Sequence, residues 1–263
     1  MSTVLAEQRR RRIAEQVRQR EVVRVTELAS QFQVSDMTIR RDLDVLARQG
    51  VVEKVHGGAL APWRSAEEPG FDVKQGLQQA EKEAIATVAA SMVPPGSSVA
   101  LSGGTTTWTL AGLLRHRSDV TVVTNSLEVA ERLHGAGPAG RVVVTGGSPT
   151  PSRSLVGPLA DATIRSLYVD LLFLGVHGLD QEAGLTTPNL AEAETDRALL
   201  DHAGQVIVLA DHAKWGTVGL GRIAGLDRVG TLVTDWGIPD RARQVLAREI
   251  RRVLVAQPLG GEG

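Results

Sequence analysis

Residues 35–43, "SDMTIRRDL", combine a helix start with apolar residues at helical spacing and two adjacent arginines. Ser35 is a good N-cap, because its hydroxyl can accept a hydrogen bond from a free backbone N–H of the first turn. On a helical wheel Ile39, Leu43 and Leu46 form one stripe, and Arg41 lies almost opposite that stripe. The stretch therefore predicts a helix that packs against its own domain and points its arginines outward.

The flanking segments predict a winged helix-turn-helix. Residues 5–18 are typical of a charged amphipathic helix, residues 22–25 of a short strand, and Thr26 of the N-cap of a second helix that ends before a turn at 33–34. We expect Gly50 to end the third helix. Residues 51–60, "VVEKVHGGAL", alternate like two strands that turn at Gly57 and Gly58.

This arrangement favours double-stranded DNA as a partner. The second helix of a helix-turn-helix enters the major groove with its N-terminal half, so Thr38, Arg40 and Arg41 are expected to contact bases and Met37 a thymine methyl group. The alternative is a solvated surface helix whose arginines pair with Asp42 or Asp44. Positive side chains with a less specific pattern either contact phosphates or are simply solvated: Arg9 to Arg12, Lys54 and His56.

Composition supports two domains. The chain has 263 residues, of which 42% are hydrophobic and 22% charged, and no cysteine, which excludes disulfides and thiolate metal sites. The net charge of −1 is unevenly distributed: residues 1–60 hold 11 Lys and Arg against 8 Asp and Glu, and the rest of the chain holds 18 against 22.

The charged start "MSTVLAEQRRRR" has no signal-peptide pattern, and no apolar run is long enough to span a membrane. We therefore expect a cytoplasmic protein with no membrane partner.

The remaining chain predicts a linker over 61–76, an α/β domain over 77–257 and a flexible tail over 258–263. Residues 62–76 lack periodicity and are rich in proline, glycine and charge. Beyond them, seven short apolar runs alternate largely with helical segments: 98–102, 121–125, 141–147, 169–176, 206–211, 231–235 and 252–256. Alternation of this kind predicts a mostly parallel sheet wrapped by helices.

Small and polar residues follow several of these runs, at the strand ends where such sheets bind ligands. In "SGGTTT", residues 102–107, two glycines and the free amides of a helix start suit a phosphate. The stretch matches neither the dinucleotide nor the P-loop pattern, and by itself it equally fits a tight turn. The candidate effector-binding residues are Ser102, Gly103, Gly104, Thr105, Thr106, Thr107, Asn125, Gly146, Gly147, Gly175, His177, Glu192 and Lys214.

Three of these candidates have specific expected roles and plain alternatives. Lys214 would supply positive charge to a phosphate, but it also fits a solvated loop lysine. Glu192, like Glu194, would bond sugar hydroxyls, but acids are favoured in a helix's first turn in any case. His177 by itself is more often a loop histidine than a ligand.

The motifs together resemble the DeoR family of bacterial transcriptional regulators. Residues 34–60 look like the helix-turn-helix signature of that family, and "LSGGTTT", "TVVTNS", "VTGG", "VDLLFLGVHG", "GLTTPN" and "LADHAKWG" look like its later blocks, in the same order. The resemblance implies that Ser35, Thr38, Arg40, Arg41 and Asp42 stand at signature positions, with Asp42 in an ion pair. It also implies a second domain with the fold of ribose-5-phosphate isomerase and the CoA transferases, which binds phosphorylated sugars or related metabolites.

Two residues depart from the family pattern. Ser102 stands where many members have aspartate, and Asp196 stands where members commonly have lysine. A carboxylate is therefore missing at the expected floor of the pocket, and one expected positive charge becomes negative. These changes predict an effector that is less anionic than the common ones, differently oriented, or different.

The expected function is a DNA-binding regulator, usually a repressor in this family, that acts on carbohydrate-metabolism genes and responds to a phosphorylated sugar-like effector. A homodimer or homotetramer is expected, because a helix-turn-helix normally binds two half-sites. We expect no cofactor, no metal and no catalytic residue. The alternatives are a sugar-phosphate isomerase with a DNA-binding appendage, for which Asp170, Glu192 and Lys214 would be available, and an orphan regulator with a degenerate pocket.

Overall fold

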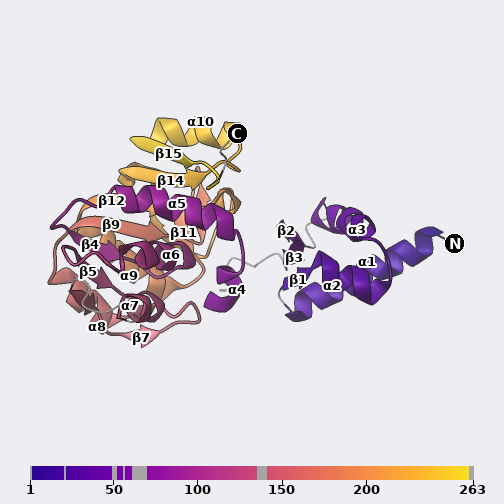
Figure 1. Cartoon of the computed structure of the whole chain (residues 1–263), viewed down its shortest axis with the longest axis horizontal. Coiled ribbons are helices and arrows are strands. Elements are labelled where there is room, and N and C mark those ends of the chain that lie inside the picture. Colours follow the sequence, from indigo (N-terminus) through magenta and orange to yellow (C-terminus); the bar gives the residue numbers. More distant parts are fainter. Residues whose placement is uncertain are drawn as a thin grey trace. The chain divides into compact units, whose positions relative to one another are not determined.

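The computed structural model describes residues 2–20, 22–48, 52–55, 57–60, 70–134 and 141–260. The chain divides into two compact units, residues 1–64 and residues 65–263, which are coloured indigo to purple and purple to yellow in Figure 1. Each unit has its own hydrophobic core among the described residues. The two units are therefore described one at a time.

The first unit is a winged helix-turn-helix, as the sequence predicts. Its elements are α1 (Ser2–Arg20), β1 (Val22–Arg24), α2 (Val25–Phe32), α3 (Asp36–Arg48), β2 (Glu53–Val55) and β3 (Gly58–Leu60). The strands form an antiparallel sheet in the order β1-β3-β2. Ile39 and Leu43 of α3 are fully buried against α1 and α2, which confirms the apolar stripe expected for this helix.

The turn between α2 and α3 also agrees with the sequence. Gln33 adopts a left-handed conformation at φ 54°, and the Thr38 backbone N–H donates to Ser35 Oγ at 3.2 Å, which makes Ser35 the cap of α3. The expected cap of α2 is wrong, because α2 begins at Val25, before Thr26. Val25 is buried and its N–H donates to Gly57 O at 2.8 Å, so the strand leads directly into the helix. The expected helix end at Gly50 lies outside the described residues.

The second unit is built on one seven-stranded parallel sheet in the order β15-β14-β12-β9-β4-β5-β6. These strands correspond to the seven apolar runs, which confirms the predicted α/β fold. The strands of the sheet are β4 (Ser98–Leu101), β5 (Thr121–Thr124), β6 (Val142–Val144), β9 (Val169–Gly175), β12 (Ala203–Leu209), β14 (Thr231–Asp235) and β15 (Arg252–Ala256).

Helices cover both faces of this sheet (Figure 1). One face packs against α5 (Gln79–Ser91), α6 (Thr105–Leu114) and α7 (Leu127–His134), and the other against α8 (Pro158–Arg165), α9 (Leu190–Asp201) and α10 (Asp240–Glu249). Side chains of β9 alternate between the two cores, with Phe173 on the first and Leu172 and Leu174 on the second.

Short elements complete the second unit. A small antiparallel sheet joins β10 (Gly178–Asp180), β11 (Gly184–Thr187) and β13 (Gly221–Ala224), and a two-stranded ladder joins β7 (Ser148–Pro149) and β8 (Leu155–Val156). Two short 3-10 helices, η1 (His212–Lys214) and η2 (Leu226–Arg228), follow β12 and β13. The loops beside these elements form much of the site described below.

The expected linker over 61–76 is wrong at its C-terminal end. Residues 71–75 form a helix, α4 (Phe71–Gln75), and Phe71 is buried with its ring edge-on to Trp108, at 6.0 Å between ring centroids. A five-residue helix with one buried aromatic gives no periodic signal in the sequence. Residues 61–69 and 261–263, which include parts of the expected linker and tail, lie outside the described residues.

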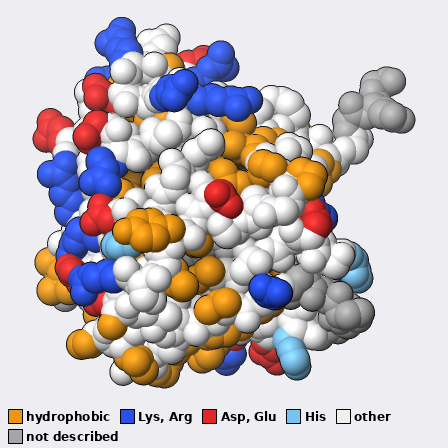
Figure 2. All heavy atoms as spheres, turned by 90° about the vertical axis from the view of Figure 1, so that its left-hand side faces the viewer, with side chains coloured by type: hydrophobic (Ala, Val, Ile, Leu, Met, Phe, Trp, Pro, Cys, Tyr) orange, Lys and Arg blue, Asp and Glu red, His pale blue; other side chains and the backbone are white. Residues whose placement is uncertain are grey.

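The surface carries mixed charge. Figure 2 shows one face, where Lys and Arg side chains gather along the upper and left-hand margins and hydrophobic side chains are exposed at several places between them. Exposed apolar atoms are normal on folded proteins and by themselves indicate no partner. Within the described ranges, no helix is long and apolar enough to cross a membrane.

Candidate functional site

The outer face of α3 carries the expected DNA-contacting side chains. Met37 is 59% exposed, Arg40 and Arg41 are also exposed, and the Thr38 and Ser35 hydroxyls lie 2.9 Å apart at the helix start. In the part of the chain that the structure describes, no ion pair joins Arg40 or Arg41 to a carboxylate. This arrangement leaves both guanidinium groups available to an external partner.

The two acids that could have paired with these arginines are engaged elsewhere. Asp42 is 4% exposed and accepts from Arg9 Nε of α1 at 2.5 Å, with Arg10 farther away at 3.9 Å. Asp44 accepts a hydrogen bond from Lys54 of β2. Asp42 is therefore the ion-pairing residue that the resemblance implies, and it ties α1 to α3. The expected contact residue His56 lies outside the described residues.

A pocket lined largely by polar residues opens in the second unit at the carboxyl ends of β4, β9 and β12. It brings together eight of the thirteen predicted effector residues: Gly103, Gly104, Thr105, Thr106, Gly175, His177, Glu192 and Lys214. The sequence prediction did not include seven further lining residues: Lys74, Ser152, Ser154, Val176, Thr187, Asp196 and Leu209. The pocket therefore has the predicted position but a larger wall.

Five predicted residues do not line this pocket, and at least three of them shape the loops behind it. Ser102 Oγ accepts from the Gly175 N–H at 2.9 Å, and Asn125 Oδ1 accepts from the Gly103 N–H at 3.0 Å. Thr107 Oγ1 donates to Gly104 O at 2.9 Å. The remaining two residues, Gly146 and Gly147, have positive φ angles of 75° and 121° in the turn before β7.

The loop from Gly103 to Thr106 is built for close approach to its backbone. A Cβ atom on Gly103 would overlap Ser154 Oγ, and Gly104 has a φ of +146°, a conformation that residues with side chains rarely adopt. The helix α6 begins at Thr105, so its first N–H groups have no partners within the helix and face the region of the pocket. Such a helix start favours an anion through these N–H groups and the helix dipole.

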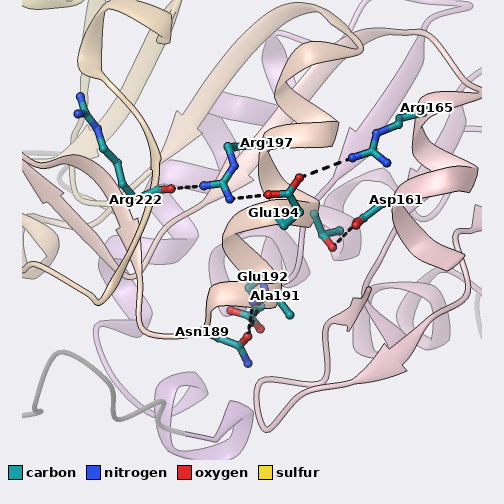
Figure 3. A network of polar contacts seen from close by, with 9 residues as sticks. Asp161, Arg165, Asn189, Ala191, Glu192, Glu194, Arg197 and Arg222 are labelled. Atoms are coloured by element: carbon teal, nitrogen blue, oxygen red, sulfur yellow. Dashed lines mark hydrogen bonds and ion pairs between the residues drawn. The ribbon is translucent and has the colours of Figure 1, made fainter. Parts of the chain in front are cut away.

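The part of the wall next to the Gly103 loop is rich in hydroxyl groups around Glu192. The Glu192 carboxylate accepts from Thr150 Oγ1 at 2.8 Å, from Thr187 Oγ1 at 3.1 Å, and from Ser152 Oγ. Asn189 caps α9 by accepting from the N–H groups of Ala191 and Glu192, as Figure 3 shows. The carboxylate is therefore held in place by the protein, and the hydroxyl groups around it form a surface suited to a polyhydroxyl ligand.

Glu194 does not share this position. Figure 3 shows it directed toward Arg197 and Arg165, at 2.6 and 3.6 Å, and it is not part of the pocket wall. Asp170, one of the three residues available to an isomerase, is also elsewhere: it accepts from the backbone N–H and hydroxyl group of Ser98, near the amino ends of β4 and β9. Of the acids considered in the sequence, only Glu192 and Asp196 line the pocket.

Charges in the pocket wall are balanced. Lys74 and Lys214 supply the positive charges, and Glu192 and Asp196 the carboxylates. Burial, together with the nearby charges of Lys214 and Lys74, lowers the pKa of His177 to about 3, so the imidazole is neutral at physiological pH. Among the described residues no group of three or more His, Asp or Glu side chains is placed to hold a metal ion.

A pair formed by the buried Asp235 and the partly exposed His212 supports the loop that carries Lys214. Asp235, fully buried at the end of β14, accepts from His212 Nδ1 at 2.8 Å, from the His212 N–H at 2.7 Å and from the Gly237 N–H at 2.7 Å. The hydrogen bond that His212 donates to Asp235 raises the pKa of His212 against the opposing effect of burial. Burial would raise the pKa of Asp235, but its hydrogen bonds outweigh this effect and lower it. Apart from an acid at a strand end, no sequence pattern predicts this pairing.

Similarity to known proteins agrees with both units. Residues 9–64 match the DeoR-like helix-turn-helix domain, and residues 77–236 match the DeoR C-terminal sensor domain. The uncharacterized HTH-type transcriptional regulator YgbI of Escherichia coli is 36% identical over 95% of this chain and 98% of its own length. The glycerol-3-phosphate regulon repressor of E. coli is 33% identical over 91% of this chain and 94% of its own length.

A solved structure gives a weaker similarity. Ribose 5-phosphate isomerase A of Methanocaldococcus jannaschii covers 51% of this chain and 53% of its own chain at 17% identity and a TM-score of 0.39, too low to support a conclusion. The relatives above are named as transcriptional regulators or repressors, not as enzymes. With both of its domains matched and its relatives aligned over nearly their full length, this chain belongs to the DeoR family of DNA-binding transcriptional regulators.

Proposed function

We propose that the protein represses carbohydrate-metabolism genes and that a phosphorylated sugar-like metabolite controls its affinity for operator DNA. Residues 1–60 act as the DNA-binding domain and residues 77–257 as the effector-binding domain. The observation that carries the proposal is the pocket, in which the start of α6 and two lysines face a hydroxyl-rich wall around Glu192. The name of one relative, a glycerol-3-phosphate regulon repressor, supports the same ligand class.

On the DNA side, α3 supplies the base contacts. Arg40 and Arg41 bind guanine edges or phosphates, Thr38 bonds a base or phosphate, and Met37 contacts a thymine methyl group. Ser35 holds the helix start, and Lys54 and His56 are phosphate contacts of the wing. The exposure of Arg40 and Arg41 and the separate engagement of Asp42 and Asp44 support this assignment.

On the effector side, the two walls of the pocket bind different ends of the ligand. The phosphate lies at the backbone of residues 103–106 with Lys74 and Lys214, because free N–H groups at a helix start and ammonium groups both favour anions. The sugar hydroxyls bond Glu192 and its neighbouring hydroxyl groups. Loop-supporting residues outside the pocket wall keep these groups in place: Ser102, Thr107, Asn125, Gly146 and Gly147.

The two domains are coupled through assembly. We propose a homodimer or homotetramer, because a helix-turn-helix regulator binds two half-sites about 34–36 Å apart. The effector changes operator affinity only if it binds one arrangement of the DNA-binding domains better than another. In this proposal the ligand acts by changing how the DNA-binding helices are spaced relative to the two half-sites.

Fluorescence anisotropy of the full chain on its own upstream DNA, titrated with phosphorylated sugars at fixed salt, tests the proposal. One metabolite should change operator affinity by about tenfold or more, which corresponds to ~1.4 kcal/mol of coupling. Lys214→Ala should bind the operator normally and lose this response, whereas Asp170→Asn, outside the pocket, should keep it. Specific DNA binding that no phosphorylated sugar changes would favour an orphan regulator, for which Asp196 in the pocket wall is the supporting observation.

A further inference from the structure

The helix α4 lines the pocket although it is too short to be stable alone. It has five residues, and isolated helices of that length do not form in water. Its position therefore depends on contacts with the rest of the second unit. At one end Phe71 packs edge-on against the Trp108 ring. The Arg132 guanidinium lies over the same ring, with Cζ at 3.5 Å from the ring centroid. At the other end α4 is bonded to Lys82.

Lys82 of α5 is a buried lysine whose ammonium group is used by the backbone at the end of α4. The residue is 5% exposed, and Nζ donates to Leu77 O at 2.6 Å and to Lys74 O. Carbonyl groups at a helix C-terminus lack intrahelical partners and carry partial negative charge, so a cation there is favourable. Lys82 thus adds a charged donor to Lys74 O, which also accepts from the Leu77 N–H at 3.3 Å, and it bonds Leu77 O just beyond the helix.

Lys74 connects the Lys82 contact to the pocket. Lys74 accepts the Lys82 hydrogen bond at its carbonyl oxygen and lines the pocket together with Lys214. We propose that Lys82 is a positioning residue that holds α4, and with it Lys74, at the anion-binding end of the pocket, and that a bound anion and this contact reinforce each other. The proposal rests on the proposed effector site.

Lysine usage supports this assignment. The chain has four lysines against 25 arginines, and three of the four, Lys74, Lys82 and Lys214, lie in or beside the pocket. Arginine stays charged at all physiological pH values, whereas a buried lysine can lose its proton. A chain that otherwise uses arginine for positive charge therefore places its titratable cations around the ligand site.

The electrostatics of Lys82 provide the coupling. The pKa of Lys82 is lowered to about 7, chiefly by burial; Asp211 and Glu81 oppose this lowering, and Lys214 and Lys74 contribute to it. A dianion between Lys74 and Lys214 offsets their repulsion, so Lys82 takes up a proton, and its charged form donates stronger hydrogen bonds to α4. The charged groups around Lys82, including those of the neighbouring cavity that it lines, are Lys74, Glu81, Glu83, Arg132, Asp211 and Lys214.

Lysine-selective NMR of the full chain tests this coupling directly, because only four lysine side-chain signals arise and single Lys→Arg variants assign them. Sulfate is the probe, since it stays a dianion from pH 6 to 9, with chloride holding the ionic strength constant. We expect the Lys82 signal to titrate with a midpoint near pH 7, and we expect this midpoint to move to higher pH when sulfate is added. By linkage, sulfate affinity should fall as pH rises from 7 to 9, by up to about tenfold per pH unit.

Variants separate positioning from simple structural support. Lys82→Arg, which keeps a charged donor, should retain hydrogen-exchange protection of residues 71–78 and give sulfate affinity with no pH dependence between 7 and 9. Lys82→Met should lose that protection and bind sulfate more weakly at every pH. Lys54→Arg, in the first unit, is the matched control and should behave as the unsubstituted protein. If His212, whose pKa is also raised, were the source of the pH dependence, that dependence would remain intact in Lys82→Arg.

The outcomes distinguish this inference from the proposed function. If sulfate shifts the Lys74 and Lys214 signals while Lys82 and the α4 amides stay unchanged, the coupling is wrong and the anion site stands. If sulfate shifts none of the three lysines, the anion site is wrong, and the coupling falls with it. A Lys82 signal that titrates near 10.5, as in an unperturbed lysine, would also overturn the coupling.

Discussion

The two units use positive charge in opposite ways. On α3 the guanidinium groups of Arg40 and Arg41 are exposed and have no carboxylate partner among the described residues. In the pocket, Lys74 and Lys214 lie in a recess with two carboxylates and a neutral His177. DNA is a large anion that can be bound on an open surface at the cost of strong salt dependence. A small ligand needs a recess with fixed partners, where each charge has more effect because water is displaced.

The largest expected effect concerns Asp42, the buried carboxylate that pairs with Arg9 and not with Arg40 or Arg41. Asp42→Ala removes the buried partner of Arg9 and should destabilise the first unit by about 3 kcal/mol, because it leaves a partly buried cation without an anion. Hydrogen exchange of α1 and α3 in the full chain measures this loss. Asp44→Ala removes a half-exposed pair with Lys54 and should cost below about 1 kcal/mol. Equal losses in the two variants would mean that Asp42 is no anchor.

The next effect concerns the open surface itself. Arg41→Ala should weaken operator binding by about 1–3 kcal/mol and relax base preference at one position if Arg41 pairs with guanine. Anisotropy on a set of operators with single base changes measures both quantities. Arg11→Ala, on α1 and paired with Glu7, is the control and should change affinity much less. An unchanged footprint and affinity would remove Arg41 from the base-contacting set.

A smaller effect concerns the pair that supports Lys214. The folded pKa of His212 is raised above the usual value of 6.5, so the pair's stabilisation is complete below that value and is lost as pH rises through the folded pKa. Asp235→Asn should therefore lower the free energy of unfolding more at pH 6, by about 1.5 kcal/mol or more, than at pH 8. Urea unfolding at the two pH values measures the difference. A loss that is the same at both would show that His212 is uncharged in the pair.

The smallest effect concerns the balance of charge in the pocket. Asp196→Asn removes one of two carboxylates from the wall and should strengthen sulfate binding by about threefold to tenfold, or ~0.7–1.4 kcal/mol. Calorimetric titration measures the change. Glu194→Gln, on the same helix but paired with Arg197 outside the pocket, should leave the affinity unchanged. Weaker binding by Asp196→Asn would indicate that this carboxylate holds the pocket together.

Contiguous patterns could be predicted from the sequence, and contacts between distant segments could not. For α3, the spacing of apolar residues within 35–46 alone separates the buried Ile39 from the exposed Arg41. The strand ends also placed Gly103 and Lys214 in the pocket, because parallel strands bring their carboxyl ends to one edge. Ser152 and Lys74 lie on a short turn and a five-residue helix, which have no periodicity. Their place depends on tertiary contacts such as that of Lys82.

The backbone of Gly103 has a consequence for how this protein can change by mutation. A Cβ atom there would overlap Ser154 Oγ and lie 2.9 Å from Ser154 Cβ, so any other residue requires the Ser154 side chain to move. Gly104, at a φ of +146°, also disfavours side chains, and the three threonines that follow are buried. Saturation mutagenesis should therefore find few tolerated substitutions along this loop. Ligand preference can then diverge in this lineage through side chains across the pocket, while the loop backbone stays constant.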